Sequence, residues 1–185
     1  REAGRTVALL DADPGQKDTG PPAALTLQSQ DPDRPPGGQP DGYYFVGAVS
    51  PRGHLLPMVV GSRRLLEEAA AEVVVVNTDG LTRGVGRILR YYQLQALAPA
   101  HLVTLERAEE TGLVPAPVGI QATRLRPSPT ARTRSPVERQ EARRRAFRAY
   151  FQEATLLELD LERISLERCR LFTGKSEDPG AFLHA

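Results

Sequence analysis

Three short apolar runs along the chain each end in a cluster of polar residues. Residues 6–10, 73–76 and 101–105 read as buried strands. They lead into Asp11-Ala12-Asp13, Asn77-Thr78-Asp79 and Glu106-Arg107. Between the second and third runs, residues 84–97 show helical spacing, with Tyr92 on the apolar side. This alternation predicts an α/β fold with a mainly parallel sheet.

The remaining segments give weaker patterns. Residues 43–49 predict another strand, and residues 54–71 predict a partial helix with Gly61 as its weak point. Residues 16–42 are rich in Pro, Gly and Asp and predict a long exposed loop. Residues 138–152 predict a helix, and the leucines of residues 156–171 suggest short strands that open a second, β-rich domain at 155–185.

The net charge of the chain is small, but its charged residues are unevenly distributed along the sequence. The chain has 185 residues and a net charge of +1, but residues 120–150 hold nine Arg against two Glu, or +7. The single cysteine, Cys169, excludes an internal disulfide framework and fits a reducing compartment, the cytoplasm or, in a eukaryote, the nucleus. No apolar run approaches the roughly 18 residues of a membrane span. Because the sequence opens without Met, we expect it to be part of a longer chain.

The stretch after the first strand carries the candidate chemistry. Asp11, Asp13 and Gln16 fall at the carboxyl end of a strand, where open α/β sheets bind ligands. Carboxylates there suit either Mg²⁺ binding or acceptance of a proton from a hydroxyl. An acidic turn that caps the next element is an equally good interpretation of this stretch alone. Gly174-Lys175-Ser176 is not a phosphate loop, because it lacks the leading Gly and the following helix.

Together these segments resemble the polynucleotide 5′-hydroxyl kinase family, the P-loop kinases of RNA processing. The resemblance rests on ALLDADPGQ, YYFVGAVSPRGHLLP, VVVVNTDGLTRGVG, LVTLER and the Arg-rich segment that ends in AFRAYF. It implies a P-loop NTPase-type kinase domain over residues 1–154, use of ATP and Mg²⁺, and phosphorylation of 5′-hydroxyl ends of RNA or DNA. It also implies RNA-processing proteins as partners. The family's phosphate loop has no counterpart in these residues, so we expect this piece alone to be inactive.

The resemblance also implies roles for individual residues. Asp13 is expected to be the base, Asp11 the Mg²⁺-side carboxylate, or the reverse, with Gln16 beside them. Thr78, Asp79 and Gly80 correspond to a clasp over the phosphates, although Leu81 stands where many members have Trp. A lid near residues 134–151 places one Arg pair on the transferred phosphate. The lid pair is Arg139 and Arg143, although Arg144 and Arg148 have the same spacing. The residues expected to contact nucleic acid are Arg124, Arg126, Arg144 and Arg148.

Two other functions stay open. A deviant-Walker ATPase of the partition class also has an acidic strand end, but it gives no reason for an Arg-rich lid. A relative that binds RNA without turnover is the second alternative. His54 and His101 are expected to be structural, since the three scattered histidines of the chain lack metal-ligand spacing.

Overall fold

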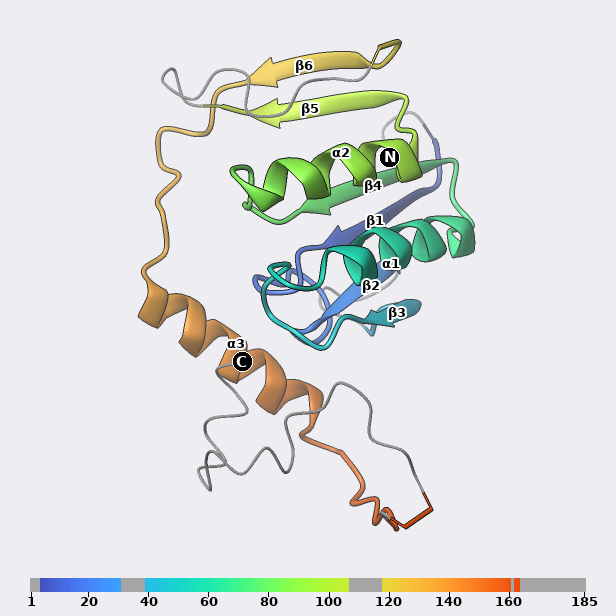
Figure 1. Ribbon diagram of the computed structural model, residues 1–185, viewed down its shortest axis with the longest axis vertical. Helices are drawn as coiled ribbons and strands as arrows, with labels where there is room; N and C mark the ends of the chain where they lie inside the picture. The colour runs from blue at the N-terminus through green and yellow to red at the C-terminus, as the bar shows by residue number, and fades with distance from the viewer. Residues whose placement is uncertain (1–3, 31–38, 107–117, 161, 164–185) are drawn as a thin grey trace.

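The computed structural model describes residues 4–30, 39–106, 118–160 and 162–163. Its larger sheet has four strands in the order β3-β2-β1-β4, and β5 and β6 form a separate parallel pair. The strands are β1 (Val7–Ala12), β2 (Ala24–Ser29), β3 (Gly42–Phe45), β4 (Val73–Thr78), β5 (His101–Leu105) and β6 (Gln121–Leu125). The helices are α1 (Leu55–Glu68), α2 (Val85–Leu97) and α3 (Pro136–Tyr150). Figure 1 shows α1 and α2 on one side of the strands, with α3 apart from them.

The larger sheet is mixed. β1 pairs in parallel with β4 and antiparallel with β2, which pairs antiparallel with β3. The predicted α/β class is therefore right, but the loop predicted over residues 16–42 is wrong where β2 lies within it. Since β3 and β1 are both antiparallel to β2, they run in the same direction and end at the same edge of the sheet.

The hydrophobic core lies between this sheet and α1. Leu10, Leu25, Met58 and Leu65 are at most 1% exposed. Gly61 is not a weak point of α1, because a Cβ there would collide with the ring of Tyr44 on β3. Glycine at this position allows the close approach of helix and strand. Tyr44 therefore points toward α1, and its neighbours Tyr43 and Phe45 point to the other face of the sheet.

β4 and β5 are less buried than their apolar sequences predict. Val75 is 51% exposed and Val103 is 53% exposed. Both strands run in the same direction (Figure 1), yet they are not paired, and a cavity of about 450 Å³ lies between them under α2. The prediction that residues 73–76 form a strand buried on both faces fails, because Val75 points to the face opposite the one on which Val74 and Val76 pack against the core. Tyr92, predicted on the apolar side of α2, is likewise 53% exposed.

No helix in the described part of the chain is long and apolar enough to cross a lipid bilayer. The predicted short strands over residues 156–171 fall largely outside the described residues, and residues 155–160 form no strand.

Candidate active site

The carboxylate of Asp13 is held by the turn that ends β1. Its Oδ1 accepts hydrogen bonds from the backbone N–H groups of Gly15, at 2.7 Å, and Gln16, at 3.0 Å. Gly15 is required there, because a Cβ would collide with the carbonyl oxygen of Val49. Among the described residues, Oδ2 of Asp13 accepts no hydrogen bond, so this oxygen is available to a ligand.

Asp13 ionises less readily than an exposed aspartate. Burial raises the pKa of the Asp13 carboxyl, and the nearby carboxylates of Asp79 and Asp11 act in the same direction. The N–H groups of Gln16 and Gly15 oppose this shift without cancelling it. A raised pKa suits a group that takes a proton near neutral pH, because it brings the affinity for that proton closer to the operating range.

Asp11 is part of strand β1, and its side chain is fully buried. It forms an ion pair with Lys17, with 3.1 Å between Oδ2 and Nζ. The backbone N–H groups of Asp13 and Asp18 also donate to its carboxylate, at 3.2 and 2.9 Å. Lys17 is itself 2% exposed at its side chain, and burial lowers its pKa while Asp11 opposes that change. The Asp11 carboxylate thus fixes the loop after β1, and its oxygens are already used.

A pocket of about 410 Å³ opens beside Asp13. It is lined from β1 and its loop, from the end of β4, and from α3 with the segment before it. The lining residues are Asp13, Gln16, Asp18, Asn77, Thr78, Arg132, Thr133, Arg134 and Arg139. One wall is therefore acidic and polar, and the opposite wall carries three guanidinium groups. The sequence prediction had placed Asp13, Gln16, Thr78 and Arg139 at one site, and the structure brings these four together.

The arginine wall is organised by the start of α3. Ser135 and Glu138 form a reciprocal capping box, in which each side chain accepts a hydrogen bond from the other residue's backbone N–H. Arg132 donates to Glu138 at 2.7 Å, and Arg139 donates to the carbonyl oxygen of Arg134 at 2.6 Å. The Ser135 backbone N–H and the Arg132 guanidinium lower the pKa of Glu138 to about 2, so its charge persists at all physiological pH values.

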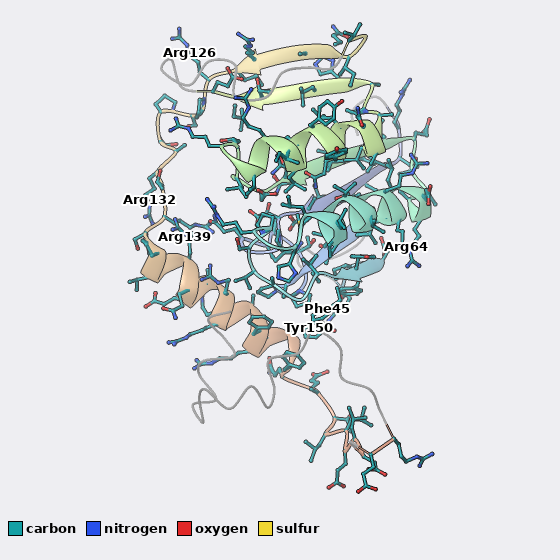
Figure 2. All side chains as sticks on the ribbon, in the orientation of Figure 1. Phe45, Arg64, Arg126, Arg132, Arg139 and Tyr150 are labelled. Atoms are coloured by element: carbon teal, nitrogen blue, oxygen red, sulfur yellow. The ribbon has the colours of Figure 1, made fainter. Side chains whose placement is uncertain are left out.

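Other predicted arginines lie outside this pocket. Arg143, Arg144 and Arg148 follow on α3, away from the lining residues. Arg124 lies on β6, its Nε 3.9 Å from the Glu106 carboxylate. Figure 2 shows Arg132 and Arg139 together near the start of α3, whereas Arg126 lies near the β5–β6 pair. Sequence reasoning missed Arg132 and Arg134, because an extended segment has no helical periodicity that could mark a common face.

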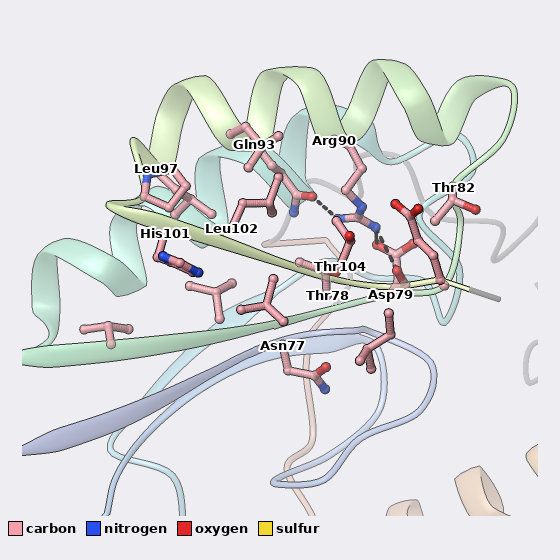
Figure 3. A pocket seen from close by; sticks show the side chains of 18 residues that line it. Asn77, Thr78, Asp79, Thr82, Arg90, Gln93, Leu97, His101, Leu102 and Thr104 are labelled. Atoms are coloured by element: carbon pink, nitrogen blue, oxygen red, sulfur yellow. Dashed lines mark hydrogen bonds and ion pairs between the residues drawn. The ribbon is translucent and has the colours of Figure 1, made fainter. Parts of the chain in front are cut away.

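The clasp residues after β4 divide between two cavities. Thr78 lines the pocket beside Asp13 and also the cavity between β4 and β5, whereas Asp79 and Gly80 line only the latter (Figure 3). Asp79 is paired with the buried Arg90, at 2.6 Å, and accepts a hydrogen bond from the Leu81 N–H. Its carboxylate therefore fixes the turn onto α2. That this turn lies as a clasp over the phosphates stays a prediction.

Comparison with known proteins decides the family. Residues 1–153 match the family model described as "mRNA cleavage and polyadenylation factor CLP1 P-loop". The chain belongs to this family. The resemblance stated from the sequence is thereby confirmed, and the mixed sheet with flanking helices is consistent with a P-loop kinase domain.

Several archaeal proteins resemble this member of the CLP1 P-loop family. It is 32% identical over 175 residues to a polyribonucleotide 5′-hydroxyl-kinase of Pyrococcus furiosus, a match that covers 92% of this chain and 49% of that protein. The protein of the same name from Thermococcus kodakarensis is 30% identical over 177 residues, which cover 92% of this chain and 50% of that protein. The chain thus spans about half the length of the curated relatives it matches.

The described residues contain no group of three or more His, Cys, Asp or Glu side chains placed to hold a metal ion. Mg²⁺ usually needs only one or two carboxylates, with water and substrate phosphates as its other ligands. Asp18, which lines the pocket beside Asp13, fits the carboxylate of such a minimal site, whereas the Asp11 carboxylate does not, because it is buried against Lys17.

Proposed function

We propose that the protein containing this chain transfers the γ-phosphoryl group of ATP to the 5′-hydroxyl end of RNA. The observation that carries this proposal is the pocket in which Asp13, Thr78 and Arg139, from three separate parts of the chain, face a common space. The P. furiosus and T. kodakarensis relatives, named polyribonucleotide 5′-hydroxyl-kinase, support it. The pocket volume of about 410 Å³ is within the range of small-molecule sites.

Asp13 is proposed as the general base. Its Oδ1 is used by the turn, so Oδ2 accepts the proton of the 5′-hydroxyl as that oxygen bonds to the γ-phosphorus. The bond from phosphorus to the bridging oxygen breaks, and ADP leaves. Gln16 and Thr78 line the same pocket as Asp13 and are placed to orient the acceptor. Asp11 acts indirectly, by fixing the loop that carries these groups.

The arginines are proposed to stabilise the transferred phosphoryl group. Phosphoryl transfer needs charge stabilisation and in-line positioning more than covalent chemistry. Arg132, Arg134 and Arg139 lie across the pocket from Asp13, and Arg139 comes from the predicted lid helix. Mg²⁺, when bound through Asp18 and the substrate phosphates, would neutralise phosphate charge and leave Asp13 Oδ2 to accept the proton. Arg143 remains a predicted member of the lid, reached only if α3 moves.

The test is transfer of labelled phosphate from ATP to an oligoribonucleotide with a 5′-hydroxyl, measured with the full-length protein. The same RNA with a 5′-phosphate is the control acceptor and should take up no label. A deoxyribonucleotide of the same sequence compares DNA with RNA. ATP hydrolysis that RNA does not change would favour the partition-class ATPase. RNA binding without transfer or hydrolysis would favour the inactive relative, and either result would refute the proposal.

A further inference from the structure

An exposed aromatic surface lies beyond the pocket, where the end of β3 meets the end of α3. We define the aromatic patch as Tyr43, Phe45, Tyr150 and Phe151. The rings of Tyr43 and Tyr150 are 6.4 Å apart, and those of Tyr150 and Phe151 are 4.9 Å apart. Phe45, on the same face of β3 as Tyr43, is 79% exposed, and its ring lies close to Gly47. Figure 2 shows Phe45 and Tyr150 at the same corner of the molecule.

The sheet places this patch close to the proposed base. β3 and β1 end at the same edge, and Phe45 pairs with Ala24 of β2. Ala23, which precedes Ala24, donates its N–H to the carbonyl oxygen of Pro14, and Pro14 directly follows Asp13. Phe45 is thus two strands away from the turn that holds Asp13, or about 10 Å at the usual strand spacing.

α3 connects the pocket with the patch. Arg139 lines the pocket and Tyr150 belongs to the patch, so eleven residues of helix, about 16 Å, separate them. Between these two points, Arg143 is the arginine on the face of α3 that carries Arg139 and Tyr150, because the helix turns by about 100° per residue. Within the described part of the chain, Arg143 forms no ion pair. A positively charged path next to flat exposed rings is the arrangement that binds single-stranded nucleic acid.

We propose that the aromatic patch stacks bases of the RNA acceptor, a few nucleotides from its 5′ end. This inference rests on the proposed function, because the 5′ end must lie beside Asp13. At about 3.4 Å per stacked nucleotide, a distance of 10 to 16 Å corresponds to roughly three to five nucleotides. The patch favours RNA over a covering polypeptide because Arg143, unpaired among the described residues, lies between it and the pocket, on the helix face that carries Arg139 and Tyr150. Stacking on aromatic rings tolerates any base, so the patch supplies affinity for single strands without sequence preference.

The experiment compares a dinucleotide with a ten-nucleotide acceptor in full-length Phe45→Ala. We expect KM for the ten-nucleotide RNA to rise about 10-fold with kcat little changed, and KM for the dinucleotide to stay the same, since the dinucleotide cannot reach the patch. Phe45→Trp should restore the wild-type KM. The matched control is Leu56→Ala on α1, which removes an equally exposed apolar side chain, 79% exposed, and should change neither acceptor.

The contrary outcomes are distinct. An unchanged KM for the long RNA, or an equal rise for both acceptors, would overturn the patch as a stacking surface. A lower melting temperature without any change in KM would also overturn it and would indicate a surface covered by polypeptide. If the wild-type protein transfers no phosphate, the proposed function fails. Fluorescence anisotropy of the labelled ten-nucleotide RNA then decides the patch on its own: weaker binding by Phe45→Ala supports it, and equal binding refutes it.

Discussion

Ionisation of Asp13 makes the folded state less stable, which gives its proposed role a signature in stability as well as in rate. We expect Asp13→Asn in the full-length protein to lower kcat by about 10²–10⁴-fold, the usual effect of losing a general base. Because the folded pKa of Asp13 lies above its unfolded value near 3.8, the charge destabilises the fold at neutral pH, and this cost disappears as pH falls through the folded pKa toward the unfolded one. Thermal melting should therefore show the variant at least as stable as wild type at pH 7, with the difference shrinking at acidic pH.

Asp11→Asn provides the comparison for that variant. It removes the partner of a buried Lys17, so we expect it to lower the melting temperature, and any loss of rate to accompany the loss of stability. An Asp13→Asn protein with a near-normal rate, beside a stable but inactive Asp11→Asn protein, would reverse the two roles.

The kinetic effect of removing an arginine of α3 should depend on its position along the helix. Arg139→Ala should lower kcat, by up to the roughly 10³-fold seen at the low end for arginine fingers, because Arg139 faces the pocket. Arg144→Ala should instead raise KM for RNA, and that effect should weaken as salt increases. Arg139→Lys should recover little of the rate, since an ammonium lacks the planar fork of donors. Steady-state kinetics at two salt concentrations make the measurement, and an unchanged kcat in Arg139→Ala would show that α3 is only a basic surface.

At single residues, the sequence predicted types of chemistry better than partners. Motif spacing located Asp13, Gln16 and Thr78 at strand ends that meet at one edge of the sheet, as the structure has them. Nothing in that spacing shows that Asp11 pairs with Lys17 or that Asp79 pairs with Arg90. Those pairs depend on how loops fold back on the strands, and an isolated carboxylate looks the same in the sequence whether it is buried or free.

Among the elements, β1, β4, β5, α2 and α3 were predictable because each has a clear apolar run or helical spacing. β2 was missed because its six residues, buried at five positions, lie within a stretch rich in Pro and Gly. The separation of β5 and β6 from the larger sheet could not be predicted either. Strand order depends on contacts between distant segments, and local periodicity does not record them.

The cavity between β4 and β5 has a consequence for backbone protection. We expect it to receive an extended segment of the full-length protein from outside these 185 residues, since the relatives are about twice as long and two parallel strand edges face it. Hydrogen exchange of the β4 and β5 amides should then be slower in the full-length protein than in the isolated chain, whereas β2 amides should differ little. Equal exchange rates for β4 and β5 in the two proteins would mean that no strand enters the cavity.

For the whole molecule, the prediction concerns what the 185 residues do alone. They contain no phosphate loop of the type GxxxxGK[ST], whose N–H groups and Lys hold the β- and γ-phosphates. We therefore expect the isolated chain to bind ATP weakly and to transfer no phosphate, while the full-length protein does both. Equilibrium titration with a fluorescent ATP analogue and the labelled-phosphate assay make the comparison. Phosphate transfer by the isolated chain would show that its own residues suffice.

The edges of β4 and β5 that have no partner strand in the described part of the chain also bear on the behaviour of the isolated chain in concentrated solution. Each presents backbone donors and acceptors together with exposed Val75 or Val103, and such edges pair readily with strands of other molecules. The net charge of only +1 provides little mutual repulsion to keep copies apart. Light scattering should accordingly reveal aggregates that grow with protein concentration. A lysine in place of Val75, at the open edge of β4, should slow their growth.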